Sequence, residues 1–369
     1  MSTILIDATY AVDPHPTGVS VYSRGLIQAL SQLPTNHKLI AGYRLSRWRR
    51  RKEFIRFDDA GKAGLTPVTT RFFQNPWTFW LRWQAGLFHS LAQRPAPFRF
   101  AREVTTILDV FPLSGRGYCS PGFARKFSAL LVEASERAGR IITPSQYTAD
   151  ELVRHTNADP GNIRVIPLGV TAAPPAPPGF DAAAERGRWA GSGNELVLVV
   201  GVIQTRKNTL GALKALERLP ENYKMALVGG DGYGCEPVHD YIRKNNLGER
   251  VIVPGYVDPP TMDRLYRSAS VLFFPSLEEG FGLPVLEAMA HGLPAVVSHT
   301  SCLPEVGGEA ALYTDPLDPA DMAEKVRMAT ENLQLRNQMI QKGIKRASEF
   351  TWQRVAEATL AVYNELLAL

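Results

Sequence analysis

Short apolar runs alternate with helix-like segments along almost the whole of this 369-residue chain. A strand followed by a helix and then by another buried strand is typical of a parallel sheet with helices packed on its faces. The alternation therefore predicts an α/β protein, and the length of the chain predicts two such domains. The predicted strands are Ile4–Ile6, Leu39–Tyr43, Val104–Leu108, Arg140–Thr143 and Arg164–Ile166 in the first half, and Leu196–Val200, Met225–Val228, Val251–Val253, Val271–Phe274 and Ala295–Val297 in the second.

A proline-rich segment separates the two predicted domains. Pro167–Gly179 holds five prolines and two glycines, a composition typical of a linker. The predicted parts are an N-terminal domain over residues 1–172, a linker over 173–194, a C-terminal domain over 195–351 and a last helix over about 352–369. The predicted helices of the first half are Val19–Leu33, Phe123–Ala138 and Ser145–His155, with Ser145 as the N-cap.

The composition is typical of a globular enzyme, with 45% apolar and 21% charged residues. No apolar run reaches the roughly 18 residues that suggest a membrane span, and the N-terminal residues 1–7 lack the basic region of a signal peptide. The cysteines, Cys119, Cys235 and Cys302, form no Cys-x-x-Cys pair, so we expect neither a zinc site nor a disulfide framework. These features predict a reducing, cytoplasmic location.

Two glutamates lie eight residues apart after the predicted strand Val271–Phe274. Glu279 is on a loop with two glycines, and Glu287 is about one turn into a helix that begins near Pro284. Ligands of open α/β sheets bind at the carboxyl ends of the strands. Two carboxylates there can accept hydrogen bonds from the ribose and the hexose of a nucleotide sugar. The alternative interpretation is two solvated glutamates on a surface helix.

Two cations follow the first strand of the second half. Arg206 and Lys207 lie just before a predicted helix with Asn208 as its N-cap. Cations beside helix N–H groups form an anion site, which suits a departing nucleoside diphosphate. A solvated helix start is the alternative. Gly18 opens the first predicted helix. Because glycine has no side chain, the backbone at Gly18 could approach a ligand closely; the alternative is a simple helix cap.

The Glu279–Glu287 segment, with Gly-Phe-Gly-Leu-Pro inside it, resembles the glutamate-x7-glutamate motif of retaining GT-B glycosyltransferases, especially glycosyltransferase family 4. The Arg-Lys-Asn run at 206–208 is similar to a signature of the same family. The resemblance implies the GT-B fold, with two Rossmann-like domains facing across a cleft and a last helix that crosses back onto the first domain. It also implies donor-binding roles for Gly18, Gly201, Gly280, Phe281, Gly282 and Leu283.

In that family the second glutamate, here Glu287, holds the ribose, and the first, here Glu279, holds hydroxyls of the donor sugar. Arg206 and Lys207 would contact the donor diphosphate. Asp109 follows the strand Val104–Leu108 and would orient the acceptor hydroxyl or stabilise positive charge at the anomeric carbon; a buried capping aspartate is the alternative.

Leu108 departs from the family pattern, because many members have a histidine before this aspartate. His89 is not a substitute, since a lone histidine after an apolar run is more often a satisfied core residue. The departure leaves open a non-catalytic nucleotide-sugar-binding or scaffold subunit. An epimerase or phosphorylase would need other acids or a pyridoxal lysine, and neither is apparent.

The glycine run Gly229–Gly234 fails the dinucleotide fingerprint, because Cys235 stands where the third glycine would be. It is interpreted either as a loop near the nucleotide base or as a tight connection. The histidines have no metal-ligand spacing and no Asp-x-Asp pair occurs, so no metal or cofactor is expected.

The formal charge of +5 is unevenly distributed. Residues Arg44–Lys52 include six cations and Trp48, and Trp77–Trp83 adds three tryptophans. Cations with aromatics suit an anionic membrane surface, so peripheral binding at the inner face of a membrane is expected. Two alternatives are nucleic-acid binding and packing of the tryptophans in the core. Nucleic-acid binding is not expected, because no RNA-binding signature accompanies these segments.

Together, these features predict a metal-independent retaining hexosyltransferase. The resemblance favours mannose from GDP-mannose as the transferred sugar, and a hydroxyl of a glycan or lipid-linked molecule as the acceptor. The leaving phosphate would take the acceptor proton, so no dedicated general base is required.

Overall fold

The computed structural model describes residues 2–13, 17–51, 68–73 and 78–368. The chain forms two compact units. Unit 1 comprises Met1–Ser114, Gly122–Gly169 and Phe350–Leu369, and unit 2 comprises Gly115–Pro121 and Val170–Glu349. The C-terminal segment thus belongs to the unit that holds the N-terminus.

Within the described residues, unit 1 is built on a seven-stranded parallel sheet in the order β3-β2-β1-β4-β5-β6-β7. The strands are β1 (Thr3–Asp7), β2 (Lys38–Tyr43), β3 (Val68–Phe72), β4 (Leu87–Ser90), β5 (Glu103–Thr106), β6 (Arg140–Thr143) and β7 (Ile163–Val165). The helices are η1 (Thr9–Val12), α1 (Gly18–Gln32), α2 (Leu45–Trp48), α4 (Leu81–Gln84), η3 (Phe111–Leu113), α5 (Pro121–Arg137), α6 (Gln146–His155), η4 (Pro160–Asn162) and α15 (Trp352–Ala368). The strand order reverses at β1 and β4, as in doubly wound sheets.

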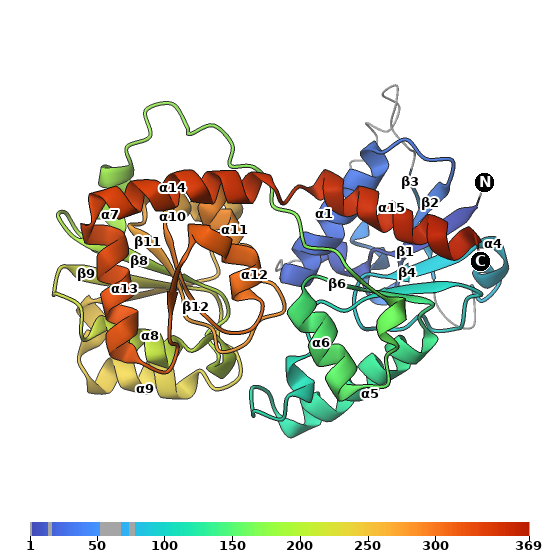
Figure 1. Cartoon of the computed structure of the whole chain (residues 1–369), viewed down its shortest axis with the longest axis horizontal. Helices are drawn as coiled ribbons and strands as arrows, with labels where there is room; N and C mark the ends of the chain where they lie inside the picture. Colours follow the sequence, from blue (N-terminus) through green and yellow to red (C-terminus); the bar gives the residue numbers. More distant parts are fainter. Residues whose placement is uncertain (1, 14–16, 52–67, 74–77, 369) are drawn as a thin grey trace. The chain divides into compact units, whose positions relative to one another are not determined.

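Unit 2 has a six-stranded parallel sheet in the order β10-β9-β8-β11-β12-β13 within the described chain (Figure 1). Its strands are β8 (Glu195–Val200), β9 (Tyr223–Val228), β10 (Val251–Gly255), β11 (Val271–Phe274), β12 (Ala295–Ser298) and β13 (Leu312–Thr314). Its helices are α7 (Ala182–Ala190), η5 (Thr205–Lys207), α8 (Thr209–Leu216), α9 (Glu236–Lys244), η6 (Leu247–Glu249), α10 (Pro259–Ser268), α11 (Leu283–Ala290), α12 (Leu303–Gly307), η7 (Gly308–Ala310), α13 (Pro319–Glu331) and α14 (Leu333–Ser348).

The ten predicted strands are all present, with small shifts at their ends, and Ser145 caps α6 by accepting a hydrogen bond from Thr148 N–H. Strands β3, β4 and β13 were not predicted. The predicted linker over 173–194 is wrong in part, because helix α7 lies inside it. Asp181 caps α7 by accepting from the backbone of the next turn, and the helix packs on α10 within unit 2.

Helix α15 is fixed to unit 1 by a tryptophan that occupies the space left by two glycines. A Cβ atom on Gly25 of α1 would lie 2.3 Å from the indole of Trp352, and one on Gly169 would lie 2.7 Å from it. The absence of side chains at these two positions therefore lets the first turn of α15 lie against α1 (Figure 1).

A buried polar chain also joins α15 to the sheet of unit 1. The ring of His89, on β4, lies 2.6 Å from the hydroxyl of Tyr363 and 2.9 Å from Thr106 Oγ1, which in turn lies 2.8 Å from the hydroxyl of Tyr22. His89 is fully buried, and burial lowers its pKa to about 3. The prediction that His89 is a satisfied core residue is confirmed. Among the described residues, no helix combines the length and apolar character needed to cross a membrane.

The buried imidazole predicts a specific dependence of stability on pH. Between the folded pKa of His89, about 3, and its ordinary value near 6.5, the unfolded chain binds one more proton than the folded chain. The contribution of His89 to the free energy of unfolding is therefore intact above pH 6.5 and is lost at roughly 1.4 kcal/mol per pH unit below it.

Urea unfolding of the wild type and His89→Gln at pH 6.5 and 5.0 tests this. The variant is expected to lose less stability between the two pH values than the wild type, whatever its absolute stability. Because other titrating groups are common to both proteins, equal losses would contradict the assignment.

Candidate functional site

The carboxyl ends of β8 and β11 lie side by side in unit 2, at the point where its strand order reverses. The loop after β8 carries Arg206 and Lys207, and the loop after β11 carries Glu279. Parallel strands end at one edge of a sheet, so this topology brings together residues more than 70 positions apart.

Glu279 is held between the two cations. Arg206 Nη1 donates to Glu279 Oε2 at 2.8 Å, and Lys207 Nζ donates to Oε1 at 2.5 Å. Arg206 and Glu279 are only 8% and 7% exposed. Burial alone would raise the pKa of Glu279, but the charges of Arg206 and Lys207 outweigh it and lower that pKa to about 2. The carboxylate is therefore ionised at neutral pH, and the three groups together carry a net charge of +1.

Backbone contacts fix the two loops to each other. Arg206 Nη1 also donates to the carbonyl of Glu278 at 2.6 Å, and Leu277 N–H donates to the carbonyl of Arg206 at 2.8 Å. Asn208 stands at the predicted N-cap position of α8, but its side chain does not cap the helix. Asn208 has the left-handed φ of 56° and makes no capping hydrogen bond; its amide instead donates to the carbonyls of Pro275 and Pro316, at 3.1 and 2.7 Å.

A third loop, after β12, supports the Glu279 backbone. Glu279 N–H donates to Ser301 Oγ at 3.1 Å, and Cys302 Sγ donates to the carbonyls of Glu279 and Phe281, each at 3.1 Å. Gly282 has a φ of 104°, and a Cβ there would lie 2.8 Å from Leu303. The run Gly280–Leu283 is thus packed tightly between β11 and α11, with Phe281 5% and Leu283 8% exposed.

Glu287 lies one turn into α11 and has a neutral partner. The hydroxyl of Tyr266, on α10, donates to Glu287 Oε2 at 2.7 Å. Burial raises the pKa of Glu287, and the hydrogen bond from Tyr266 counteracts that rise. Tyr266 stacks on His291, with ring centroids 5.1 Å apart, and His291 Nδ1 donates to the carbonyl of Glu287 at 2.7 Å. Neither Tyr266 nor His291 was predicted from the sequence. The spacing of four between Glu287 and His291 was an available signal, whereas Tyr266 comes from another helix and gave none.

The glycines after β8 and β9 bring two backbones into contact. Gly201 and Gly229 have φ values of 135° and 150°, and a Cβ on Gly229 would lie 2.1 Å from the carbonyl oxygen of Gly201. A Cβ on Gly201 would lie 3.3 Å from Lys207 Cε. Of the two interpretations of Gly229–Gly234, the tight connection accounts for this geometry, and Gly201 leaves room for Lys207. A donor-binding role of Gly201 stays a prediction.

Two predicted site residues belong to unit 1. Gly18 is the first residue of α1, after Thr17 at the N-cap position, and a Cβ there would have no neighbour within 4 Å. Asp109, half-buried, follows β5. Both therefore follow strands at the carboxyl edge of the first sheet. Their roles toward a donor or an acceptor stay predictions.

The basic, aromatic segments of unit 1 divide into buried and exposed parts. Arg44 is buried and internal: it lies 3.3 Å from Asp7 and donates to the carbonyl of Pro95 at 2.7 Å, so its predicted membrane contact is wrong. Trp80 and Trp83 are 40% and 66% exposed, which argues against the core alternative for both. The predicted positions Lys52 and Trp77 lie outside the described residues.

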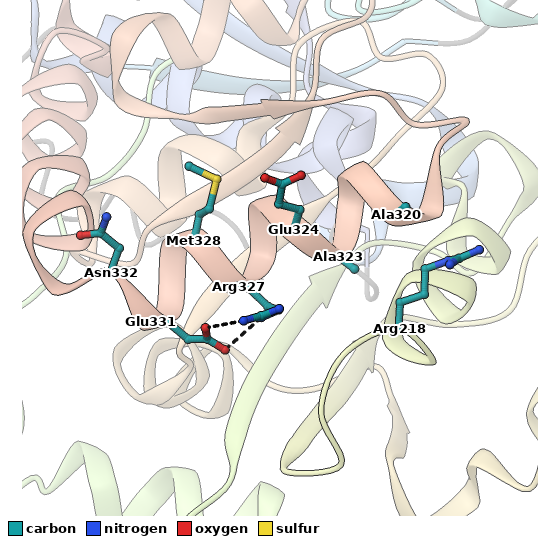
Figure 2. Close-up of a pocket in the computed structure, with 8 residues that line it drawn as sticks. All are labelled: Arg218, Ala320, Ala323, Glu324, Arg327, Met328, Glu331 and Asn332. Carbon is teal, nitrogen blue, oxygen red and sulfur yellow. Dashed lines mark hydrogen bonds and ion pairs between the residues drawn. The ribbon is translucent and has the colours of Figure 1, made fainter.

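A pocket of about 590 Å³ lies elsewhere in unit 2, along α13 (Figure 2). Arg218 and residues of α13 line it, including the ion pair of Arg327 with Glu331 at 3.1 Å. None of the predicted site residues lines this pocket, so it is distinct from the candidate site.

Comparisons with known proteins match both halves of the chain. A family model described as Glycosyltransferase Family 4 matches residues 16–173, and one described as Glycosyl transferases group 1 matches residues 184–346. O-antigen chain mannosyltransferase B of Escherichia coli is 28% identical over 73% of this chain and 72% of that protein. D-inositol 3-phosphate glycosyltransferase of Acidothermus cellulolyticus is 30% identical over 63% of this chain; the match spans only 54% of that relative.

Solved structures agree over the whole chain. Sucrose-phosphate synthase from Thermosynechococcus elongatus has a TM-score of 0.77 at 20% identity, with 100% of both chains covered. Anabaena HepE, in complex with UDP and glucose, has a TM-score of 0.76 at 16% identity, covering 99% of this chain and 100% of that one. These likenesses concern the fold, and the predicted GT-B fold is confirmed. On the two family models together with the Arg-Lys-Asn and glutamate-x7-glutamate motifs, the chain belongs to the family 4, group 1 glycosyltransferases.

Proposed function

We propose that this glycosyltransferase is a metal-independent, retaining hexosyltransferase that uses a nucleotide-diphosphate sugar and acts on a hydroxyl of a glycan or lipid-linked acceptor. The single observation that supports this most is the buried arrangement of Arg206 and Lys207 around Glu279 at the switch point of the unit 2 sheet. It supplies two cations for a leaving diphosphate and a carboxylate for sugar hydroxyls at one position.

The proposed reaction needs little acid–base chemistry from the protein. The bond from the anomeric carbon to the β-phosphate oxygen breaks, and the acceptor oxygen bonds to the same face of that carbon. The acceptor proton passes to the leaving phosphate oxygen. Arg206 and Lys207 would stabilise the charge that develops on the diphosphate, and Glu287 would accept hydrogen bonds from the ribose.

GDP-mannose is our proposed donor. The family motif favours it, and so does the 28% identity to a protein named O-antigen chain mannosyltransferase B. HepE was solved with UDP and glucose, so UDP-glucose is the natural comparison donor.

Leu108 supports a second candidate function, a non-catalytic subunit that binds nucleotide sugars. Its side chain cannot supply the hydrogen bond or the proton that a histidine would. The test offers GDP-mannose and acceptor glycans to the folded wild-type protein. Binding of GDP-mannose without hydrolysis or transfer would favour this candidate.

Replacement of Arg206 tests the catalytic assignment. Arg206→Ala is expected to lower turnover with GDP-mannose by roughly 10²-fold, because one donor to the leaving diphosphate is lost. Release of GDP is measured in the presence of EDTA, which also tests the proposed independence from metals. Arg218→Ala, at the separate α13 pocket, is the matched control and should retain wild-type turnover. A near-normal rate for a folded Arg206→Ala protein contradicts the role.

Tyr266→Phe tests whether Tyr266 positions Glu287. Loss of the hydrogen bond to a charged acceptor is expected to raise the KM for the donor about tenfold while kcat changes little. Because that hydrogen bond lowers the pKa of Glu287, the variant should also lose donor affinity at a higher pH than the wild type as the pH falls. Tyr241→Phe, on α9, is the control. If the dependence of KM on pH is the same for Tyr266→Phe as for the wild type, Tyr266 has only a structural role.

Membrane binding is proposed for the exposed aromatic turn at residues 79–83. Phe79 and Trp83 are 44% and 66% exposed, with Arg82 lying 4.5 Å from the ring of Trp83. Apolar rings with an adjacent cation suit an anionic lipid interface.

The double variant Phe79→Ala/Trp83→Ala is expected to reduce sedimentation with phosphatidylglycerol vesicles at least about tenfold, and salt should weaken wild-type binding. Leu333→Ala, a substitution of a 69% exposed apolar residue in unit 2, is the control. Equal binding by wild type and double variant would exclude this surface.

A further inference from the structure

Three side chains of metal-binding chemistry meet at the start of α9 in unit 2. Asp231 lies in the loop after β9, Cys235 directly precedes α9, and His239 lies one turn into the helix. One carboxylate oxygen, the Sγ atom and one ring nitrogen lie within 4.8 Å of one another. None of the three belongs to the glutamate pair or to the cations of the candidate site. We propose that they form a binding site for a divalent transition-metal ion, best matched by Zn²⁺.

The ligand set selects this class of ion. A thiolate, an imidazole and a carboxylate are the ligands that Zn²⁺ takes in four-coordinate sites, whereas Mg²⁺ and Ca²⁺ prefer oxygen alone. Tetrahedral Zn²⁺ at its usual bond lengths holds its ligand atoms roughly 3.3–3.7 Å apart. Asp231 Oδ1 and His239 Nε2 lie 2.7 Å apart, somewhat closer than this, and all three ligand atoms lie within 4.8 Å of one another. The fourth position would be filled by water, since three protein ligands leave it open.

Small side-chain movements are enough to reach that geometry. The side chains of Asp231 and His239 are 58% and 32% exposed, so they can separate by the roughly 0.6–1 Å that Zn²⁺ geometry requires without disturbing the core. Cys235 and His239 are four residues apart, a spacing that places two side chains on the same face of a helix.

The backbone that carries these residues is well fixed. Ile203 N–H donates to the carbonyl of Gly230, and Gly232 N–H donates back to the carbonyl of Ile203, each at 2.9 Å. Thr205 N–H donates to the carbonyl of Tyr233 at 3.2 Å. A Cβ on Gly234 would lie 2.2 Å from Thr205 Oγ1. The ligand loop is therefore bound along its length to the segment that precedes Arg206.

This contact gives the site a structural consequence. A bound ion would cross-link the β9–α9 loop to the first turn of α9 and so restrict the segment 203–205 that leads to the two cations. The ion would not take part in glycosyl transfer, so the proposal is compatible with metal-independent catalysis. The expectation of no metal site relied on the absence of Cys-x-x-Cys and Asp-x-Asp pairs and of metal-ligand spacing among the histidines; the observed cluster combines one cysteine, one histidine and one aspartate spaced by four.

Metal titration of the full chain, freed of metal with a chelator, tests the proposal without any donor or acceptor. Co²⁺ is the spectroscopic probe, because a thiolate ligand gives a charge-transfer band, and Zn²⁺ is titrated in competition with a chromophoric chelator. We expect one equivalent of each ion to bind, and Zn²⁺ to raise the thermal unfolding temperature. Cys235→Ser should abolish the band and weaken Zn²⁺ binding at least about 100-fold, and His239→Gln should weaken it similarly.

Cys119→Ser is the matched control and should retain the band and the Zn²⁺ affinity. Circular dichroism of each metal-free variant establishes that it is folded. The proposal is overturned if wild type binds no stoichiometric Zn²⁺, which would leave Asp231 and His239 as a simple hydrogen-bonded pair. It is also overturned if the band survives in Cys235→Ser.

Discussion

A buried carboxylate between two cations, Glu279 with Arg206 and Lys207, determines how the carboxyl edge of the unit 2 sheet is built. Removing the carboxylate would leave two positive charges unbalanced by it in a poorly hydrated place, where loss of a buried ion-pair partner typically costs about 3–5 kcal/mol. Neither loop can therefore shift without the other. The amide of Asn208 and the hydroxyl of Ser301 extend the constraint, since they fasten the same two loops to neighbouring backbone.

The two glutamates of the motif have opposite electrostatic environments. Cations lower the pKa of Glu279, whereas burial raises the pKa of Glu287, whose hydrogen-bond partner is the uncharged Tyr266. Titratable groups with pKa values pushed apart are a common sign of divided roles. This division fits our proposal, in which one carboxylate shares its cations with a diphosphate sugar and the other only accepts hydrogen bonds from a ribose.

Much of the fold could be predicted from sequence because buried parallel strands are short apolar runs, and ten strands were found in this way. Strand β4 was missed because His89 and Ser90 interrupt its apolar pattern, although both are buried and hydrogen-bonded. Local propensity placed Asn208 correctly at the N-cap position of α8 but did not predict its side-chain contacts, because the left-handed backbone turns the amide toward two carbonyls of other segments.

In the candidate site too, residues within sequence motifs could be predicted, whereas residues brought in by tertiary packing could not. The residues that motifs point to, Arg206, Lys207 and Glu279, were predictable, and the structure brings them together. Tyr266 was not, because its role depends on the packing of α10 against α11, and no spacing along the chain encodes that contact. Asp231, Cys235 and His239 likewise become a cluster only once the β9–α9 loop is fixed to the preceding segment.

The membership of α15 in unit 1 has a consequence for biosynthesis. The ribosome makes β4 and α1 early, but the partners that complete their polar and apolar contacts, Tyr363 and Trp352, follow all of unit 2 in the sequence. Domains usually fold as units during synthesis, N-terminal first. Here all of unit 2 precedes α15 in the sequence and can fold first, while the nascent first unit still lacks the Tyr363 partner of His89 and the indole that packs on Gly25.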